Sequence, residues 1–214
     1  ERESIWEREL NETRRNLKAE RIESLMIHDA NELKGKSGLL LRKWLREKKE
    51  EKVINKTGVS IYDSRDLEDI YMDEIDIVQL PISIYNQQNM KGGLIKNLKR
   101  EGKEIHARSI FLQGLILNEE NKWPGFLTQN FREHHKRWLE EINIKGSSPL
   151  KETMKYLNAI KEIDLIIIGI ENIKQLEEIY MSEKTDESES EYKSFEIWGW
   201  ANVRDTDPRL WKNI

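Results

Sequence analysis

The chain has 214 residues, 37% of them hydrophobic, which is enough to bury the core of one large α/β domain or two small ones. Its 36 Lys and Arg against 40 Asp and Glu give a net charge of −4, and without a basic excess we expect no nucleic-acid partner. The absence of cysteine excludes disulfides and thiolate nucleophiles, fits a reducing compartment, and so favours the cytoplasm. No apolar run approaches the ~20 residues that span a bilayer, so we expect no membrane partner.

Short runs rich in Ile, Val and Leu alternate along the chain with longer segments of helical period, which is typical of βα units around a parallel sheet. The predicted strands are 22–28, 53–60, 75–80, 104–111 and 165–169. The predicted helices are 5–17, 39–49, 66–72, 94–99, 131–142, 150–160 and 173–180. Because the strand runs are nearly continuously apolar, we expect each strand to be buried on both faces.

Several residues mark where these helices begin and end. Ser64 and Asn172 are suited to cap helix starts, Pro149 to the first turn of a helix, and Gly102 to a helix end. Residues 181–194 are acidic and serine-rich, which predicts a solvated loop after a main body at 1–180. Residues 195–214 hold three of the seven tryptophans, so we expect this aromatic tail to dock on the body.

Polar or small residues stand at or just after the ends of several predicted strands. His28 and Asp29 follow the first strand at its carboxyl end, where parallel α/β folds assemble their active sites, although a histidine there can equally be a structural residue bonded to a loop. Gly58 and Ser60 would let a ligand approach the second strand, or form an ordinary turn. The Gln79 amide, among apolar neighbours, must be satisfied internally or offered to a ligand.

Five segments in this order resemble the aldo/keto reductase family, in particular a bacterial branch associated with sugar and cell-surface biosynthesis. They are "LKAERIESLMIHD", "KTGVSIYDSRDLEDI", "IDIVQLPISIYNQQ", "EIHARSIFLQGLIL" and "IDLIIIGIENIKQLEEI". The resemblance implies an α/β fold of the (β/α)8 TIM-barrel type. It covers the part from the fourth barrel strand to the C-terminus, so the barrel here is incomplete, with about five βα units and the tail.

The resemblance also implies a nicotinamide cofactor, NADPH or NADH, and a small-molecule aldehyde or ketone substrate. His28 matches the histidine that orients and polarises the carbonyl, and Ser60 and Gln79 match the residues that hold the nicotinamide carboxamide. Ile61 departs from the Asn or Arg found in many members. Further cofactor-binding positions implied are Arg108, Ser109, Ile110, Phe111, Leu112 and Gln113 at the nicotinamide and pyrophosphate, and Gly169, Glu171, Gln175 and Glu178 at the adenosine end. Glu171 would repel a 2′-phosphate, which favours NADH.

The Asp, Tyr and Lys that complete the family's catalytic tetrad lie on the first three barrel strands, which this sequence does not contain. We therefore expect a fragment lacking the general acid and inactive alone; a split enzyme and a noncatalytic dinucleotide-binding or assembly module, completed by self-association or a partner chain, are the alternatives. Tyr62 and Tyr85 are expected to be packed loop residues and His106 a structural strand residue. The pair His134 and His135 is expected on a solvated helix face, with no metal.

Overall fold

In the computed structural model, residues 2–182 and 193–211 are described, and the chain divides into two compact units. Unit 1 comprises Glu1–Leu80 and Asn97–Ile105, and unit 2 comprises Pro81–Lys96 and His106–Ile214. One sheet of five strands runs in the order β1-β2-β3-β4-β5. The (β/α)8 barrel has eight such strands, so the predicted α/β class with an incomplete parallel barrel is confirmed.

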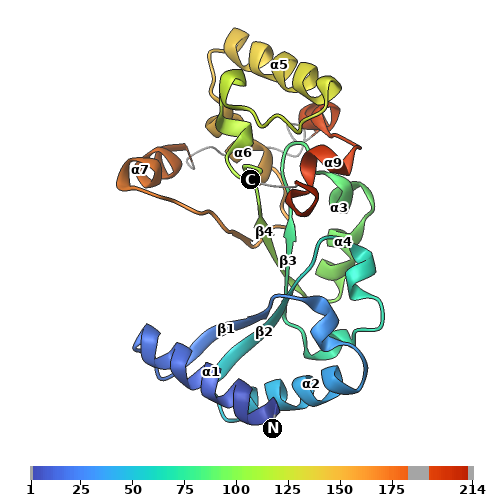
Figure 1. Ribbon diagram of the computed structural model, residues 1–214, viewed down its shortest axis with the longest axis vertical. Coiled ribbons are helices and arrows are strands. Elements are labelled where there is room, and N and C mark those ends of the chain that lie inside the picture. Colours follow the sequence, from blue (N-terminus) through green and yellow to red (C-terminus); the bar gives the residue numbers. More distant parts are fainter. Residues whose placement is uncertain (1, 183–192, 212–214) are drawn as a thin grey trace. The chain divides into compact units, whose positions relative to one another are not determined.

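Unit 1 contains the first strands and helices of the chain (Figure 1). Its elements are α1 (Arg2–Leu17), β1 (Ile22–Ile27), α2 (Gly35–Glu50), β2 (Ile54–Ser60) and most of β3 (Ile77–Pro81). The β1–β2 and β2–β3 pairs are parallel. The two helices contact each other through Trp6 and Trp44, whose rings lie 5.8 Å apart, while the Trp44 indole donates to Glu7.

Gly58 is required by the packing of neighbouring strands. It pairs with Met26, and a Cβ on Gly58 would lie 2.3 Å from the Met26 sulfur and 3.0 Å from the Ile77 Cβ. Both distances are shorter than ordinary van der Waals contact. The space above Gly58 is therefore occupied by Met26, and the interpretation that this glycine admits a ligand is wrong.

Unit 2 holds most of the remaining elements, and the division between the units passes through α4 and β4. The elements are α3 (Gln88–Lys91), α4 (Leu94–Arg100), β4 (Glu104–Arg108), α5 (Gln129–Ile144), α6 (Pro149–Asn158), β5 (Leu165–Ile166), α7 (Ile173–Ser182) and α9 (Val203–Thr206). Strands β4 and β5 pair in parallel, with His106 opposite Leu165.

Most of the predicted helix and strand ends differ from the structure by a few residues, and four differences are larger or change the element or its cap. Strand β4 ends at Arg108 rather than residue 111, because Ser109 adopts a left-handed φ of 56° that no strand accommodates. Strand β5 is two residues long instead of five. The helix predicted over 66–72 is replaced by two 3-10 turns, Ser64–Leu67 and Met72–Glu74, and the first is capped by Asp63 rather than Ser64.

The other predicted boundary residues behave as expected. Gly102 follows α4 with a φ of 78°, and Pro149 opens α6 behind a Ser148 cap whose hydroxyl accepts from the Lys151 N–H. The Asn172 side chain accepts from the Gln175 N–H at the start of α7. Residues 183–192 of the predicted acidic loop, and 212–214 of the tail, lie outside the described residues.

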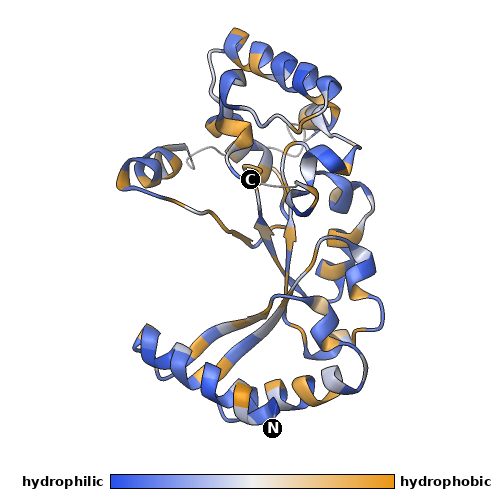
Figure 2. Cartoon of the chain, viewed as in Figure 1, coloured by the Kyte–Doolittle hydropathy of each residue, from blue (hydrophilic) through white to orange (hydrophobic). Residues whose placement is uncertain are grey.

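Burial on both faces holds for some strands and fails for the two at the ends of the sheet order. The last four residues of β2 are buried, and so are four of the five residues of β3. In β1 only Ile22 is buried, and in β5 neither residue is. In Figure 2 part of the ribbon of α7, and of the segment that leads into it, has the colour of hydrophobic residues. A barrel strand is buried only when neighbours lie on both sides of it, and β1 and β5 each have one neighbour in this sheet.

The core of unit 2 is built around one face of α5. Phe131, His134, His135, Trp138 and Ile142 are all buried, with the spacing of a single helical stripe. The prediction that this histidine pair lies on a solvated helix face is therefore wrong. Both rings are in the core, where burial lowers the pKa of His135 to about 3 and also lowers the pKa of His134.

The aromatic tail contacts this same helix. The His134 Nε2 lies 3.0 Å from the Trp198 carbonyl oxygen, and the Trp200 ring packs against Phe131 and His134. Asp205 is fully buried and accepts hydrogen bonds from both the N–H and the hydroxyl of Thr128, each at 2.8 Å. The tail thus satisfies the capping residue of α5 as well as covering its apolar face.

Candidate functional site

Three of the predicted site residues meet at the carboxyl end of the unit 1 strands. Ser60, the last residue of β2, pairs directly with Gln79 of β3, and its hydroxyl lies 3.5 Å from the Gln79 Oε1. Ile27, the last residue of β1, pairs with Val59, so His28 follows β1 at the level of Ser60. The parallel register therefore aligns an imidazole, a hydroxyl and an amide along one edge.

The His28 ring is exposed, and within the described residues it makes no hydrogen bond or ion pair. The loop hydrogen bond that would make it a structural residue is therefore not present in the described part of the chain. Of the three polar side chains, Ser60 on β2 is buried, Gln79 on β3 is half-buried, and His28 after β1 is exposed. Such an edge can hold a planar polar ligand at Ser60 and Gln79 and leave His28 facing solvent.

The loops after β1 and β2 are fixed by their own acidic side chains. Asp29 accepts from the Asn31 N–H and caps the 3-10 turn Ala30–Leu33. Asp66 accepts from the Tyr62 and Asp63 N–H groups at 2.6 and 3.3 Å. Ile61, where a polar contact was in doubt, is fully buried, so its side chain serves packing. These turns hold the strand ends in place.

A cavity of about 500 Å³ in unit 1, which the sequence analysis did not anticipate, is lined in part by Asp29, the residue after His28, while His28 itself is not among the lining residues. It is formed by the start of α1, the turn after β1 and the start of α2. Its lining residues are Arg2, Ile5, Trp6, Asp29, Asn31, Glu32, Ser37 and Leu41. The only sequence signal was Asp29 next to His28, because the other residues come from separate helices.

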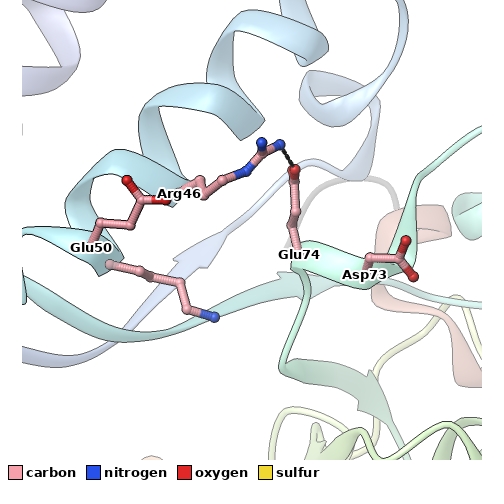
Figure 3. Close-up of a pocket in the computed structure, with 5 residues that line it drawn as sticks. Arg46, Glu50, Asp73 and Glu74 are labelled. Carbon is pink, nitrogen blue, oxygen red and sulfur yellow. Dashed lines mark hydrogen bonds and ion pairs between the residues drawn. The ribbon is translucent and has the colours of Figure 1, made fainter.

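A second cavity in unit 1, of about 450 Å³, lies at the end of the sheet away from His28 (Figure 3). It lies near the turn Met72–Glu74, which precedes β3, and so at the amino end of the strand. Arg46 is paired with Glu74, and Lys49 with Asp76 at 2.5 Å. The two cations that line this cavity are therefore held in structural ion pairs, and Glu50 and Asp73 also contribute to its lining.

In unit 2, the segment after β4 adopts an unusual backbone. Ser109, Leu112 and Gln113 all have φ values between 45° and 57°, and Gly114 follows at 82°. The Arg108 guanidinium donates to the Ser109 hydroxyl at 3.2 Å. Several non-glycine residues in left-handed conformations within one turn are characteristic of segments shaped for a function.

The side chains of this segment alternate between the core and the surface. Ile110 and Leu112 are buried, Phe111 is half-buried and Gln113 is exposed. Any ligand contact at position 110 would therefore use the main chain. The segment is closed by the Leu112 N–H bond to the Ser109 carbonyl at 3.0 Å.

The predicted adenosine-end residues cluster at the start of α7. The Glu171 N–H donates to the Gln175 side chain at 2.8 Å, and Glu178 lies 3.7 Å from the Lys174 ammonium. Gly169, Glu171 and Glu178 are exposed and Gln175 is half-buried. Gly169, Glu171 and Glu178 are thus accessible to solvent, while the Gln175 side chain is held by the Glu171 N–H.

The two tyrosines that follow strand ends differ in their surroundings. Tyr85 is fully buried, its hydroxyl is bonded to the His135 Nδ1, and burial raises the pKa of its phenol well above the usual value. Tyr62 is half-exposed and its N–H is held by Asp66. His106 is buried in β4, as expected of a structural strand residue.

The model of the aldo/keto reductase family matches residues 1–198, and the chain therefore belongs to this family. No curated protein matches it. Within the described part of the chain, none of the helices has the length and apolar character needed to cross a membrane.

Solved structures share this fold at low identity. The apo form of aldo-keto reductase AKR11C1 from Bacillus halodurans has a TM-score of 0.76 and 13% identity, covering 95% of this chain and 72% of that one. Glycerol dehydrogenase AKR11B4 from Gluconobacter oxydans has a TM-score of 0.71 and 14% identity, covering 96% and 65%. A variant of Gox0644 in complex with NADPH has a TM-score of 0.66 and 18% identity, covering 96% and 69%. This chain thus spans about two thirds to three quarters of the length of these proteins.

Proposed function

We propose that this chain forms part of an NAD(P)H-dependent oxidoreductase that reduces a small aldehyde or ketone. The observation that supports the proposal most directly is the alignment of His28, Ser60 and Gln79 at the carboxyl edge of three parallel strands. A sugar-linked carbonyl is the proposed substrate class, as in the bacterial branch that the sequence resembles. A cytoplasmic location is part of the proposal, since the cysteine-free composition fits a reducing compartment.

The residues of the edge suit a nicotinamide. A carboxamide both donates and accepts hydrogen bonds, and the Ser60 hydroxyl and Gln79 amide, 3.5 Å apart, can satisfy both functions. When bound, the cofactor supplies a hydride. His28, exposed beside them, would donate a hydrogen bond to the substrate carbonyl oxygen and so polarise the carbon that accepts the hydride.

The remaining cofactor contacts are assigned to unit 2 on the family resemblance. Arg108 and the segment 109–113 are proposed to bind the pyrophosphate, and the residues around the start of α7 the adenosine end. The exposed Glu171 carboxylate would repel a 2′-phosphate and accept from a ribose hydroxyl, which favours NADH. Glu171→Ser should therefore improve NADPH binding relative to NADH.

The proton that completes the reduction is proposed to come from a residue outside these 214. Tyr85 is excluded by its burial and its bond to His135. Losing a general acid lowers rates by ~10² to 10⁴, so we expect the chain alone to be inactive.

Cofactor binding tests the proposal without requiring turnover. NADH and NADPH fluorescence would be titrated with this chain, with the chain joined to the first three βα units of a solved relative, and with a Gln79→Leu variant. We expect binding that weakens by about tenfold in the variant, the equivalent of one lost hydrogen bond to a ligand. Unaltered binding by the variant, or none by either form, would contradict the assignment.

A second candidate function is that of a noncatalytic assembly module completed by another chain. The observation that favours it is the apolar surface of β5 and α7, in which no residue is buried. Its exposed members are Leu165, Ile167, Ile170, Ile173, Leu176, Tyr180 and Met181. Exposed patches of this kind mark interaction surfaces. Sedimentation velocity separates the candidates, since a module should associate through this surface and a Leu176→Glu variant should not.

A further inference from the structure

The cavity lined in part by Asp29 combines an aromatic ring with polar groups of both hydrogen-bonding types. The Trp6 ring is half-buried at its wall, and Arg2, Asn31 and Ser37 supply donors. Asp29 and Glu32 supply carboxylate acceptors. A sugar ring presents apolar C–H faces together with hydroxyls that donate and accept, which is the complement of this lining.

Part of this lining is held ready by the fold and part is uncommitted. The Arg2 guanidinium donates to the Ser37 hydroxyl at 2.6 Å, joining the starts of α1 and α2. The Trp6 ring is supported from behind by Trp44. In contrast, within the described residues neither the carboxylate of Glu32 nor the indole N–H of Trp6 makes a hydrogen bond.

The charge balance of the cavity selects among hydroxylated ligands. Two carboxylates, Asp29 and Glu32, oppose the single guanidinium of Arg2. Only one Asp29 oxygen is used by Asn31. A phosphate or carboxylate would meet a net negative lining, whereas a neutral ring would find acceptors for its hydroxyls.

We propose that this cavity binds a neutral sugar ring, stacked on Trp6 and hydrogen-bonded by Glu32 and Asp29. Because Asp29 directly follows His28, the bound ring would be the non-reacting part of the substrate, with its carbonyl toward His28. This last step rests on the proposed function. Binding of the sugar itself does not require the cofactor or the reaction.

The test is a titration of the cofactor-free chain with methyl α-D-glucopyranoside, followed by ¹H–¹⁵N NMR of the tryptophan indole and backbone amide signals. We expect a Kd on the order of 1 mM and shifts confined to the Trp6 indole and the amides of 29–37. Glu32→Ala should weaken binding by about tenfold, because it removes a charged acceptor. Glucose 6-phosphate should bind more weakly than the neutral glucoside.

Glu32 is exposed and unpaired among the described residues, so its replacement should not disturb folding, and Glu12→Ala serves as the matched control on the exposed surface of α1. Trp6→Ala provides a second variant, with its urea midpoint recorded to confirm folding. Failure of the glucoside to bind, equal binding by Glu32→Ala, or tighter binding of the phosphate would overturn the proposal. Glucoside binding here, with no binding of NADH or NADPH by the chain or by the chain joined to the first three βα units, would contradict only the reductase assignment.

Discussion

Acid should destabilise unit 2 through the buried imidazole of His135. Its pKa is lowered to about 3 by burial, while the unfolded chain should show the ordinary value of 6.5. Between these values the unfolded chain binds a proton that the folded chain does not, so stability present above pH 6.5 is lost as pH falls toward 3. At a pH near 5 this difference amounts to about 2 kcal/mol from His135 alone.

Urea unfolding followed by tryptophan fluorescence at pH 7.5 and 5.0 measures this effect, since Trp123 and Trp138 pack against the His135 ring. His135→Phe loses the Tyr85 bond and should be less stable at both pH values, but its loss on acidification should be smaller by about 2 kcal/mol. The control variant His28→Gln, at an exposed position, should lose as much unfolding free energy between pH 7.5 and 5.0 as the parent does. An equal pH dependence in His135→Phe and the parent, or an NMR pKa near 6.5 for His135, would refute the reasoning.

Two further substitutions test packing and the tail. Gly38→Ala would place a Cβ 2.1 Å from the carbonyl carbon of Leu33, so we expect a loss of about 1–3 kcal/mol in urea unfolding, while Gly125→Ala, with open space around it, should change stability little. Asp205→Ala removes the buried acceptor of the Thr128 N–H and hydroxyl and of the Trp200 indole N–H, and should cost about 3 kcal/mol. It should also speed proteolysis of the tail at residues 195–211; an unchanged cleavage rate would show that the tail is not held through Asp205.

The fold was predictable from the sequence where local pattern and long-range packing agree. The alternation of apolar runs and helical segments located all five strands, because each run lies in a parallel sheet whatever its exact ends. A strand end was predicted wrongly where the conformation of a single residue determines it. At Ser109, for example, the left-handed backbone conformation ends β4. Nothing in its residue type predicts this, since serine has no general preference for positive φ.

The histidine pair illustrates a different failure. A solvated face was favoured over a metal site because adjacent helical residues point about 100° apart and no carboxylate ligands are evident. Positions 131, 134, 135, 138 and 142 nevertheless repeat with helical period, and all are buried. Histidine is uncharged when buried, so it belongs with the apolar stripe in this helix.

Only the part of the candidate site that lies at strand ends could be predicted from the sequence. His28 follows β1, Ser60 ends β2, and Gln79 pairs with Ser60 within β3. Parallel strands bring such positions to one edge of the sheet. The cavity lined in part by Asp29 depends on Trp6 and Glu32, which belong to a helix and a turn 26 positions apart in the printed sequence. No spacing rule links those residues; the packing of α1 on α2 through Trp6 and Trp44 does. Candidate site residues can therefore be inferred from strand ends, whereas a cavity of this kind depends on helix packing that the sequence pattern does not reveal.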